Sequence, residues 1–337
     1  MIPKIIGLFN SKSGVGTTTV VYHLAHIFSK MGHSVLAIDL DPQANLTSAF
    51  FDEMEMVQQQ LDHKTIFACL EPMINGVGDI QEPQPIKIRD GLFVIDGDLH
   101  LNFFENNLID AWQKHYEGKE DALRITTAFY RIMLSGAEKC GAEIILVDVG
   151  PNLGAINRAA ILSMDYLVSP ITIDLFSMQG TQCGGAYVRS WQQNWKTIIQ
   201  KQGKGLNIPI PKGEVTPIGY VFLHHARRQS SSLNLCMQYA EGITGVEASC
   251  AQQYRQSFTN VFSDRGIEFP DSNCLGSLQS YCSLIPMAQE VLKPVFDLLP
   301  ADGAIGGYTN LVGIAYHEFK ALAENIITRT SQNVQPE

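Results

Sequence analysis

The residues best suited to chemistry are glycine and hydroxyl residues near the start of the chain. They follow an apolar run at residues 3–9 and precede a stretch in which apolar residues recur at helical spacing. The first N–H groups of a helix lack internal partners and lie at the positive end of its dipole, so this arrangement favours a phosphate at residues 14–18. The predicted nucleotide ligands are Ser11, Lys12, Ser13, Gly14, Val15, Gly16, Thr17, Thr18 and Thr19.

This loop departs from the usual phosphate-binding pattern, G-x-x-x-x-G-K-[ST], at two positions. In that pattern the Lys reaches the β- and γ-phosphates and the Ser or Thr binds Mg²⁺. Here Ser11 replaces the first glycine and Thr17 replaces the Lys, whereas Thr18 keeps the hydroxyl. Loss of one charge-assisted hydrogen bond of about 1.5–3 kcal/mol weakens triphosphate binding by about 10- to 150-fold. Lys12 is the candidate for a replacement cation.

Three aspartates lie at the ends of apolar segments. Asp39 and Asp41 follow the segment 34–38, and Asp148 follows the apolar run 144–147. Open α/β sheets bind ligands at the carboxyl ends of their strands. We therefore predict that Thr18 and Asp148 are placed to bind Mg²⁺ and that Asp39 and Asp41 bring two more carboxylates to the same site. The alternative for Asp39 and Asp41 is a cap or turn role next to Pro42.

These residues need a frame of alternating strands and helices. The pattern predicts strands at about residues 3–9, 34–38, 91–95, 143–149, 165–171 and 215–223, and helices at about 18–31, 56–70, 122–140, through 191–195 and at 316–326. This alternation is typical of a doubly wound α/β fold with a mostly parallel sheet and helices on both faces. We expect one domain, residues 1–330, with insertions at about 51–90 and at 236–284, the second containing extra helices. Residues 331–337 are expected to be a flexible tail.

Composition limits the class of protein. The chain has 337 residues, 45% of them hydrophobic and 17% charged, and shows neither an apolar run of membrane-spanning length nor a basic-then-apolar leader. We therefore expect a soluble, cytoplasmic, globular protein. The net charge of −10 argues against a surface coated for non-specific nucleic-acid binding, but it allows a local basic patch. The seven cysteines include no C-x-x-C pair, which favours reduced, mostly buried thiols.

Several motifs together resemble one family. The stretch Lys-Ser-Gly-Val-Gly-Thr-Thr-Thr at 12–19 resembles the deviant Walker A loop (K-G-G-V-G-K-T-T) of the ParA/MinD family of dimerising ATPases. Asp-Leu-Asp-Pro-Gln-Ala-Asn at 39–45 is similar to the next motif of that family. Residues 148–154 are similar to its Walker B and switch segment, with Gly150 and Asn152 replacing the usual Pro and Ser. The family pattern resumes at 287–297, so the resemblance spans nearly the whole chain outside the two insertions.

The resemblance implies roles for individual residues. Lys12 would reach across a sandwich dimer to the partner's nucleotide, Asp41 would position the attacking water, Asp148 would order Mg²⁺ and Asp39 would support the metal's waters. Arg227 aligns with the Arg of the segment that reads adenine, although Phe222 and His225 replace the Asn and Asp expected nearby. The implied ligands are ATP and Mg²⁺.

The resemblance also implies partners. These are a nucleotide-dependent homodimer, a partner protein that stimulates or reads the switch, and non-specific DNA. The candidate DNA contacts are Arg189, Lys196, Lys201, Lys204, Arg227 and Arg228, and the alternative is that they are ordinary solvated charges. Within residues 307–329, Lys320 and Arg329 are matched by Glu318 and Glu324, which argues against a basic membrane-targeting helix.

The function expected from these motifs is a nucleotide-dependent dimerising switch that positions DNA or another cargo. Because Thr17 replaces the Lys, ATP hydrolysis is expected to be weak or slow, and whether the chain is still an ATPase is left open. One alternative is a pseudo-ATPase that acts as a regulatory or structural partner protein. Another is a small-molecule ligase or reductase of the same superfamily. Arg158 is a further candidate for a charge near the phosphates, with a surface ion pair as the alternative.

Overall fold

A single eight-stranded sheet forms the centre of the molecule. The computed structural model describes residues 2–115, 121–172, 174–202, 207–224, 243–266, 273–281 and 283–332. The strand order is β3-β4-β2-β5-β1-β6-β7-β8, and every pair is parallel except β3 with β4. The strands are β1 (Lys4–Leu8), β2 (Val35–Asp39), β3 (Ile86–Arg89), β4 (Leu92–Ile95), β5 (Ile144–Asp148), β6 (Tyr166–Thr172), β7 (Thr216–Leu223) and β8 (Cys274–Leu278).

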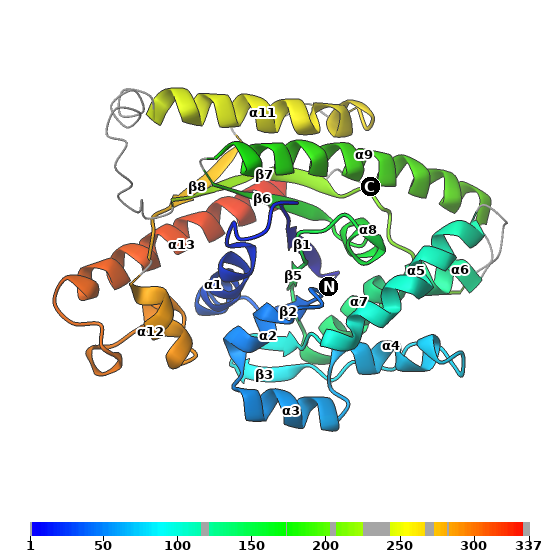
Figure 1. Ribbon diagram of the computed structural model, residues 1–337, viewed down its shortest axis with the longest axis horizontal. Coiled ribbons are helices and arrows are strands. Elements are labelled where there is room, and N and C mark those ends of the chain that lie inside the picture. The colour runs from blue at the N-terminus through cyan, green and yellow to red at the C-terminus, as the bar shows by residue number, and fades with distance from the viewer. Residues whose placement is uncertain are drawn as a thin grey trace.

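Helices cover both faces of this sheet (Figure 1). One face packs against α1 (Thr17–Lys30), α2 (Asn45–Phe50), α12 (Leu284–Glu290) and α13 (Gly307–Gln332). The other face packs against α4 (Ile66–Ile74), α5 (Asn102–Lys114), α6 (Asp121–Thr126), α7 (Ala128–Cys140), α8 (Ala155–Leu162), α9 (Leu175–Gln202) and α11 (Ile243–Ser263). Helix α11 lies along the outer side of α9. The short helix α3 (Glu53–Leu61) and the 3₁₀ turns at Leu99–Leu101, Val295–Asp297 and Pro300–Asp302 complete the described elements.

Successive side chains of the central strands point to opposite faces of the sheet, and so they form two separate hydrophobic cores. In β1, Ile5 packs into the core under α5, α7 and α8, whereas Ile6 packs into the core under α1 and α13. Successive side chains of a strand point to opposite faces, so a central strand covered on both faces is apolar throughout. All five residues of β2 and of β5 are buried, including the aspartates that end them. The expected doubly wound α/β class is therefore confirmed.

Most predicted elements are present, and the differences lie in short or interrupted segments. All six predicted strands are found, but the edge strands β3 and β8 were missed. Strand β8 lies within the segment 236–284, for which helices were expected, and it contains Gly276 and polar residues that weaken a strand pattern. The predicted helix 122–140 is divided into α6 and α7 at Thr127, whose hydroxyl donates to the Leu123 carbonyl at 2.6 Å. The predicted helix 56–70 is likewise two helices, α3 and α4.

The sheet brings the ends of three strands together. Strand β5 lies between β1 and β2, with Asp39 opposite Asp148 on one side and Leu8 opposite Asp148 on the other. The glycine-rich loop leaves β1 at this same edge. The topology thus places the loop beside the two strand-terminal aspartates, as the sequence predicted.

Candidate functional site

The loop between β1 and α1 adopts a conformation that only glycine accepts readily. Gly14 and Gly16 have φ values of 73° and 88°, in the left-handed region. Gly16 is the N-cap of α1, and no side chain caps this helix. Its first N–H groups are therefore available to an anion. A Cβ at Gly16 would also lie 3.2 Å from the Leu223 side chain, so both the conformation and the space favour glycine there.

Two residues anchor the loop to the neighbouring strand and helix. The buried Asn10 amide donates to the Pro170 carbonyl at 2.8 Å, and its oxygen accepts from the Lys12 N–H at 3.0 Å. Ser11, which takes the position of the first glycine, donates its hydroxyl to the Gly180 carbonyl of α9 at 2.9 Å. The Ser11 side chain thus holds the loop against α9.

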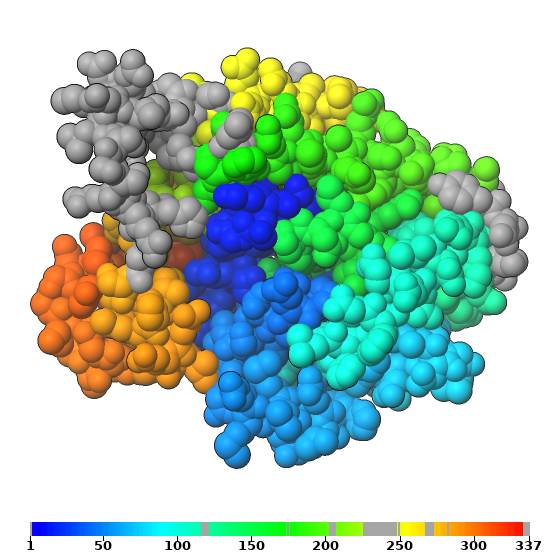
Figure 2. Space-filling model, in the orientation of Figure 1, coloured from blue at the N-terminus to red at the C-terminus, as the bar shows by residue number. Residues whose placement is uncertain are grey.

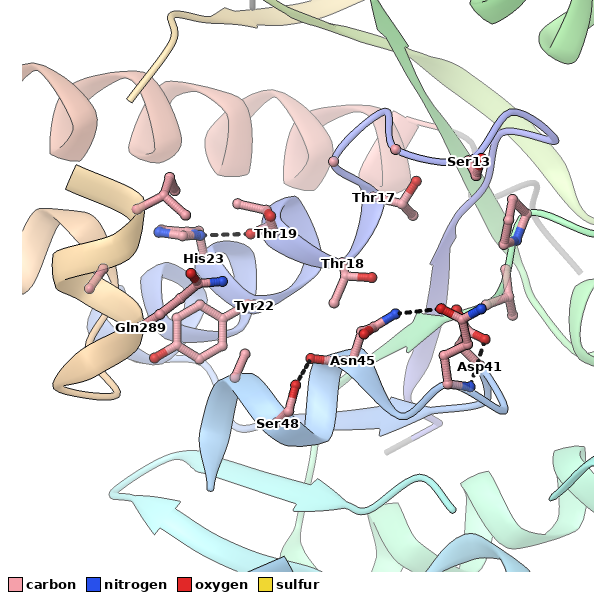
Figure 3. Close-up of a pocket in the computed structure, with 18 of the residues that line it drawn as sticks. Ser13, Thr17, Thr18, Thr19, Tyr22, His23, Asp41, Asn45, Ser48 and Gln289 are labelled. Carbon is pink, nitrogen blue, oxygen red and sulfur yellow. Dashed lines mark hydrogen bonds between the residues drawn. The ribbon is translucent and has the colours of Figure 1, made fainter. Parts of the chain in front are cut away.

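A cavity of about 390 Å³ opens at the N-terminus of α1. Figure 3 shows Ser13, Thr17, Thr18 and Asp41 toward one end, and Tyr22, His23 and Gln289 toward the other. The walls come from the loop, α1, α2 and α12. In Figure 2 the blue N-terminal segment reaches the surface near the middle of the face shown. Predicted ligands that line this cavity are Lys12, Ser13, Gly14, Gly16, Thr17, Thr18, Thr19 and Asp41.

Lys12 is paired within its own chain. Its ammonium lies 2.9 Å from the Asp174 carboxylate, which also accepts from the Thr172 hydroxyl and from the Ser177 N–H. Burial opposes the charged form of Asp174, but the hydrogen bonds from Lys12, Thr172 and Ser177 outweigh it and lower the pKa of Asp174. Asp174 holds the loop lysine beside the start of α9. No role was predicted for Asp174, although it follows strand β6 closely.

The two aspartates of the 39–45 motif have different surroundings. Both oxygens of Asp39 are used within the protein, since they accept from the Asp41 N–H at 3.1 Å and from the Thr47 N–H and hydroxyl at 2.9 and 2.8 Å. Burial raises the pKa of Asp39 to about 6, against the effect of these bonds. Asp39 therefore fixes the turn into α2, which is the alternative role considered for it. Asp41 lines the cavity instead, and its carboxylate accepts from the Gln43 N–H at 3.0 Å.

Asp148 fits a magnesium ion better than Asp39 does. Its side chain is fully buried, and neither carboxylate oxygen completes a hydrogen bond of normal geometry within the described residues. Burial and the charge of Asp39 raise its pKa well above the ordinary value, although the nearby Thr18 hydroxyl favours the charged form. A carboxylate left without donors is a group that a cation would satisfy. Thr18 and Asp148 together therefore suit Mg²⁺, which needs only one or two protein ligands besides phosphate and water.

Larger metal clusters are not found. In the part of the chain that the structure describes, no three His, Cys, Asp or Glu side chains are arranged to hold a metal ion.

A second, smaller cavity of about 150 Å³ also lies at the α1 N-terminus. Gly16, Thr19 and Ile285 line both cavities, so the two are neighbours. The walls of the second cavity come from the ends of β7 and β8 and from α13, mainly through apolar side chains. Arg227, the residue predicted to read the base, lies outside the described residues.

The loop after Asp148 is held by two residues for which the sequence gave no role. The buried Asn157 amide donates to the carbonyls of Gly150 and Asn152 at 2.5 and 2.7 Å. Glu105 of α5 accepts from the Ala155 and Ile156 N–H groups, at 2.6 and 2.9 Å, and so caps the start of α8. A carboxylate 50 residues away in sequence carries no local signal of this contact.

The predicted DNA-contact residues are only partly described. Arg189 forms a two-pronged pair with Asp264, at 2.6 and 3.0 Å, whereas Lys196 and Lys201 are exposed. Lys204, Arg227 and Arg228 lie outside the described residues. The Arg158 guanidinium stacks 3.7 Å from the centre of the Trp112 ring. Arg158 does not line the cavity, so its candidate phosphate role gains no support.

The described helices include none that is long and apolar enough to cross a membrane.

Comparison with known proteins gives a consistent family. A family model described as an AAA domain matches residues 3–201. The chain is 29% identical to an uncharacterized protein of Methanocaldococcus jannaschii over 53% of the chain and 62% of that relative's length. It is 25% identical to the sporulation initiation inhibitor protein Soj of Bacillus subtilis, over 59% of the chain and 70% of Soj. It is 24% identical to the chromosome partitioning protein ParA of Caulobacter vibrioides, over 86% of the chain and 94% of that protein.

Solved structures share the fold. A protein of Corynebacterium diphtheriae superimposes with a TM-score of 0.70 at 21% identity, over 98% of this chain and 99% of that one. A putative plasmid partition protein of Borrelia burgdorferi bound to AMPPNP superimposes with a TM-score of 0.55 at 18% identity, over 97% of this chain and 99% of that one. The pNOB8 ParA bound to nonspecific DNA superimposes with a TM-score of 0.58 at 16% identity, over 98% of this chain and 100% of that one. Since the matched family model covers more than half of the sequence and the sheet is mostly parallel with helices on both faces, as expected, the chain belongs to the ParA/MinD family of P-loop ATPases.

Proposed function

We propose that this chain is a ParA-type switch that binds ATP with Mg²⁺, dimerises in the bound state and positions DNA or another cargo. The observation that carries the proposal is the uncapped N-terminus of α1 facing a cavity that also contains Lys12, Thr18 and Asp41. Free N–H groups, the Lys12 cation and the Asp41 carboxylate around one cavity suit a triphosphate and its metal ion.

The residues divide the work of phosphate binding. The N–H groups of the loop and of the first turn of α1 would hold the phosphates, with Thr18 and Asp148 as the groups that suit Mg²⁺. When bound, Mg²⁺ would neutralise charge on the β- and γ-phosphates. Asp41 lies at the cavity wall, where its carboxylate can accept a proton or orient a water molecule.

The loop should bind triphosphate weakly in a monomer. Thr17 supplies no cation, and Lys12 is held by Asp174 in the same chain. If Lys12 acts on the partner's nucleotide, binding and dimerisation become coupled, because each then favours the other. We therefore propose weak binding by the monomer, tighter binding by the dimer and slow hydrolysis.

The relatives support the rest of the proposal. They include chromosome and plasmid partition proteins, and one solved relative is bound to nonspecific DNA. In this chain, Lys196 and Lys201 are exposed on α9, which makes them the described candidates for backbone contacts to DNA. DNA retention that weakens with added salt would support this part.

A pseudo-ATPase is the second candidate. It is favoured by one specific observation, the combination of Thr17 in the lysine position with Lys12 paired to Asp174. In that case the cavity would regulate or stabilise the protein without turnover.

One experiment separates these functions. ATP binding is measured by calorimetry with Mg²⁺, alongside sedimentation with and without nucleotide, on the wild type and on Lys12→Ala and Thr17→Lys. Lys64→Ala is the control, because Lys64 pairs only with the surface residue Asp62 in the described residues. ATP-driven dimerisation that is lost in Lys12→Ala but kept in Lys64→Ala supports the switch, and turnover by Thr17→Lys measures the hydrolysis that the loop has lost. Absence of any nucleotide binding at millimolar concentration would overturn the proposal.

A further inference from the structure

The loop after β5 forms part of the wall of the larger cavity, next to Asp41. Val149 and Pro151 line this cavity, and Gly150 lies between them in the chain. A Cβ on Gly150 would lie only 3.1 Å from the Asp41 Oδ1 atom. The Asp41 carboxylate therefore lies directly against the Gly150 backbone, in space that any other side chain at position 150 would need.

Space explains this glycine, whereas backbone conformation does not. The φ value of Gly150 is not left-handed, unlike those of Gly14 and Gly16. A Cβ there would also lie 3.3 Å from the Asn152 amide nitrogen. Because glycine leaves the chain more freedom than the proline that is usual at this position in the family, another group has to hold the loop beside Asp41.

Asn157 provides this restraint. Its buried amide nitrogen donates to the carbonyls of Gly150 and Asn152, so the loop is tied to α8 at two points. These bonds use carbonyls that precede α8, whereas Glu105 accepts from two N–H groups at the start of that helix. Asn157 therefore restrains the loop and does not cap its own helix.

The orientation of the amide follows from the same bonds. In a flipped amide the Asn157 oxygen would face two carbonyl oxygens, so the nitrogen has to point at the loop. The oxygen is then buried with no hydrogen-bond partner among the described residues. Since a buried acceptor without a partner lowers stability, stability alone does not account for asparagine at this position.

From this geometry we infer that Asn157 is a positioning residue for ATP hydrolysis, because it fixes the loop against which Asp41 orients the attacking water molecule. The inference rests on the proposed function, which gives Asp41 its role. Asn157 itself does not line the cavity. Its effect on hydrolysis therefore passes through Gly150 to Asp41.

ATP hydrolysis and ATP affinity, measured on matched variants, test the inference. The wild type, Asn157→Leu and Asp41→Asn are compared by calorimetry and by single-turnover hydrolysis with Mg²⁺, each also in the Thr17→Lys background. For Asn157→Leu we expect hydrolysis to slow by about 10- to 100-fold, the effect of moving a catalytic group by up to about 1 Å, while ATP affinity changes by less than about threefold. Its rate should not fall below that of Asp41→Asn, because Asn157 acts only through Asp41.

Two further variants separate positioning from folding. Asn325→Leu removes an amide that donates to the Leu275 carbonyl at 2.8 Å, and neither residue lines a cavity. Hydrolysis by this control should stay within about twofold of the wild type. Gly150→Ala disturbs the contact with Asp41 from the other side, so it should also slow hydrolysis while ATP affinity is kept. It replaces Asn157→Leu if thermal melting shows that Asn157→Leu does not fold.

Hydrogen exchange gives a readout that does not require activity. In Asn157→Leu, exchange over residues 149–154 should be faster than in the wild type, whereas exchange in β5 should be unchanged. Unchanged exchange in the loop would overturn the inference.

The hydrolysis outcomes are equally decisive. An unchanged rate in Asn157→Leu, a parallel loss of ATP affinity, or a rate below that of Asp41→Asn would overturn the inference without overturning the proposed nucleotide site. ATP binding without hydrolysis in both backgrounds would overturn it as well, because Asp41 would then have no reaction to serve. If the wild type binds no ATP, the proposed function itself fails.

Discussion

The ammonium of Lys12 and the carboxylate of Asp174 are 2.9 Å apart within one chain, across the gap between the glycine-rich loop and the start of α9. Both side chains are about one-third exposed, at 31% and 34%, so the pair is partly screened by solvent. If Lys12 acts on a partner subunit's nucleotide as proposed, this contact has to open first. Its release is the step that would couple nucleotide binding to dimerisation.

Replacing Asp174 should make dimerisation easier. In Asp174→Asn the Lys12 ammonium loses its charged partner, while the remaining side-chain oxygen can still accept from the Ser177 N–H. An ion pair of this exposure contributes up to about 1 kcal/mol, and a homodimer releases two of them, so ATP-driven dimerisation should occur at up to about thirtyfold lower protein concentration. Sedimentation at several protein concentrations measures the shift. The double variant with Lys12→Ala should show no such gain, and a gain there would mean that Asp174 acts independently of Lys12.

Asp96 should make the protein less stable as the pH rises. Its buried carboxylate has no described hydrogen-bond partner, and burial, with the charges of Asp39 and Glu55, raises its pKa to about 8. The folded state therefore keeps a proton that the unfolded chain releases above its ordinary pKa near 4. The stabilisation from this group is present at low pH and is lost as the pH rises toward 8.

Asp96→Asn removes this dependence, because its side chain is neutral in both states. At pH 7 the variant should be more stable by up to about 4 kcal/mol, and the difference should shrink to about 1 kcal/mol at pH 4.5. Urea denaturation at the two pH values gives the comparison. An equal difference at both would show that Asp96 is ionised in the folded protein.

His26 should make the protein less stable as the pH falls, which is the opposite of the effect of Asp96. Neither ring nitrogen has a described partner, and burial, followed by the neighbouring charges of His23, Arg89 and Lys30, lowers the pKa of His26 to about 3. Below pH 6.5, His26 binds a proton in the unfolded chain but stays neutral in the folded protein. His26 therefore does not lower the free energy of unfolding above pH 6.5, but it lowers it progressively as the pH falls below 6.5.

His26→Leu keeps an apolar side chain of similar volume against Phe50, which the His26 ring stacks on. Its stability relative to the wild type should improve by about 2 kcal/mol between pH 8 and pH 5. The midpoints of urea unfolding at these two pH values report the change. Parallel pH profiles for the two proteins would count against a buried, neutral His26.

Glu105 should control the order of the loop that follows Asp148. Glu105→Ala removes the carboxylate that accepts from the Ala155 and Ile156 N–H groups, and loss of such a cap costs about 0.5–2 kcal/mol. Hydrogen exchange should therefore become faster over residues 150–158, while exchange in the β5 strand stays as in the wild type. Glu105→Gln, which can still accept one bond, should lie between the two. Uniform acceleration over the whole domain would point to a general loss of stability instead.

Much of the site could be predicted because its signals are local. The glycines of the loop, the hydroxyl residues after them and the aspartates that end apolar strands lie next to the elements that position them. Parallel strands with both faces covered read as continuous apolar runs, so six strands were predicted. The edge strands β3 and β8 were missed because their residues are partly exposed to solvent. Their sequences therefore lack the continuous apolar run of a buried strand.

The sequence by itself thus determined the α/β class, the phosphate loop and the aspartates at the strand ends, because short-range spacing encodes turns, caps and buried strands. Only the tertiary structure decided which groups meet across the fold. Asp174 contacts Lys12 from 162 residues away, and Glu105 caps a helix 50 residues later. The oxygens of Asp39 accept from Asp41 and Thr47, whereas those of Asp148 have no hydrogen-bond partner among the described residues. Such contacts depend on strand order and on helices packing side by side, and neither leaves a mark in local spacing.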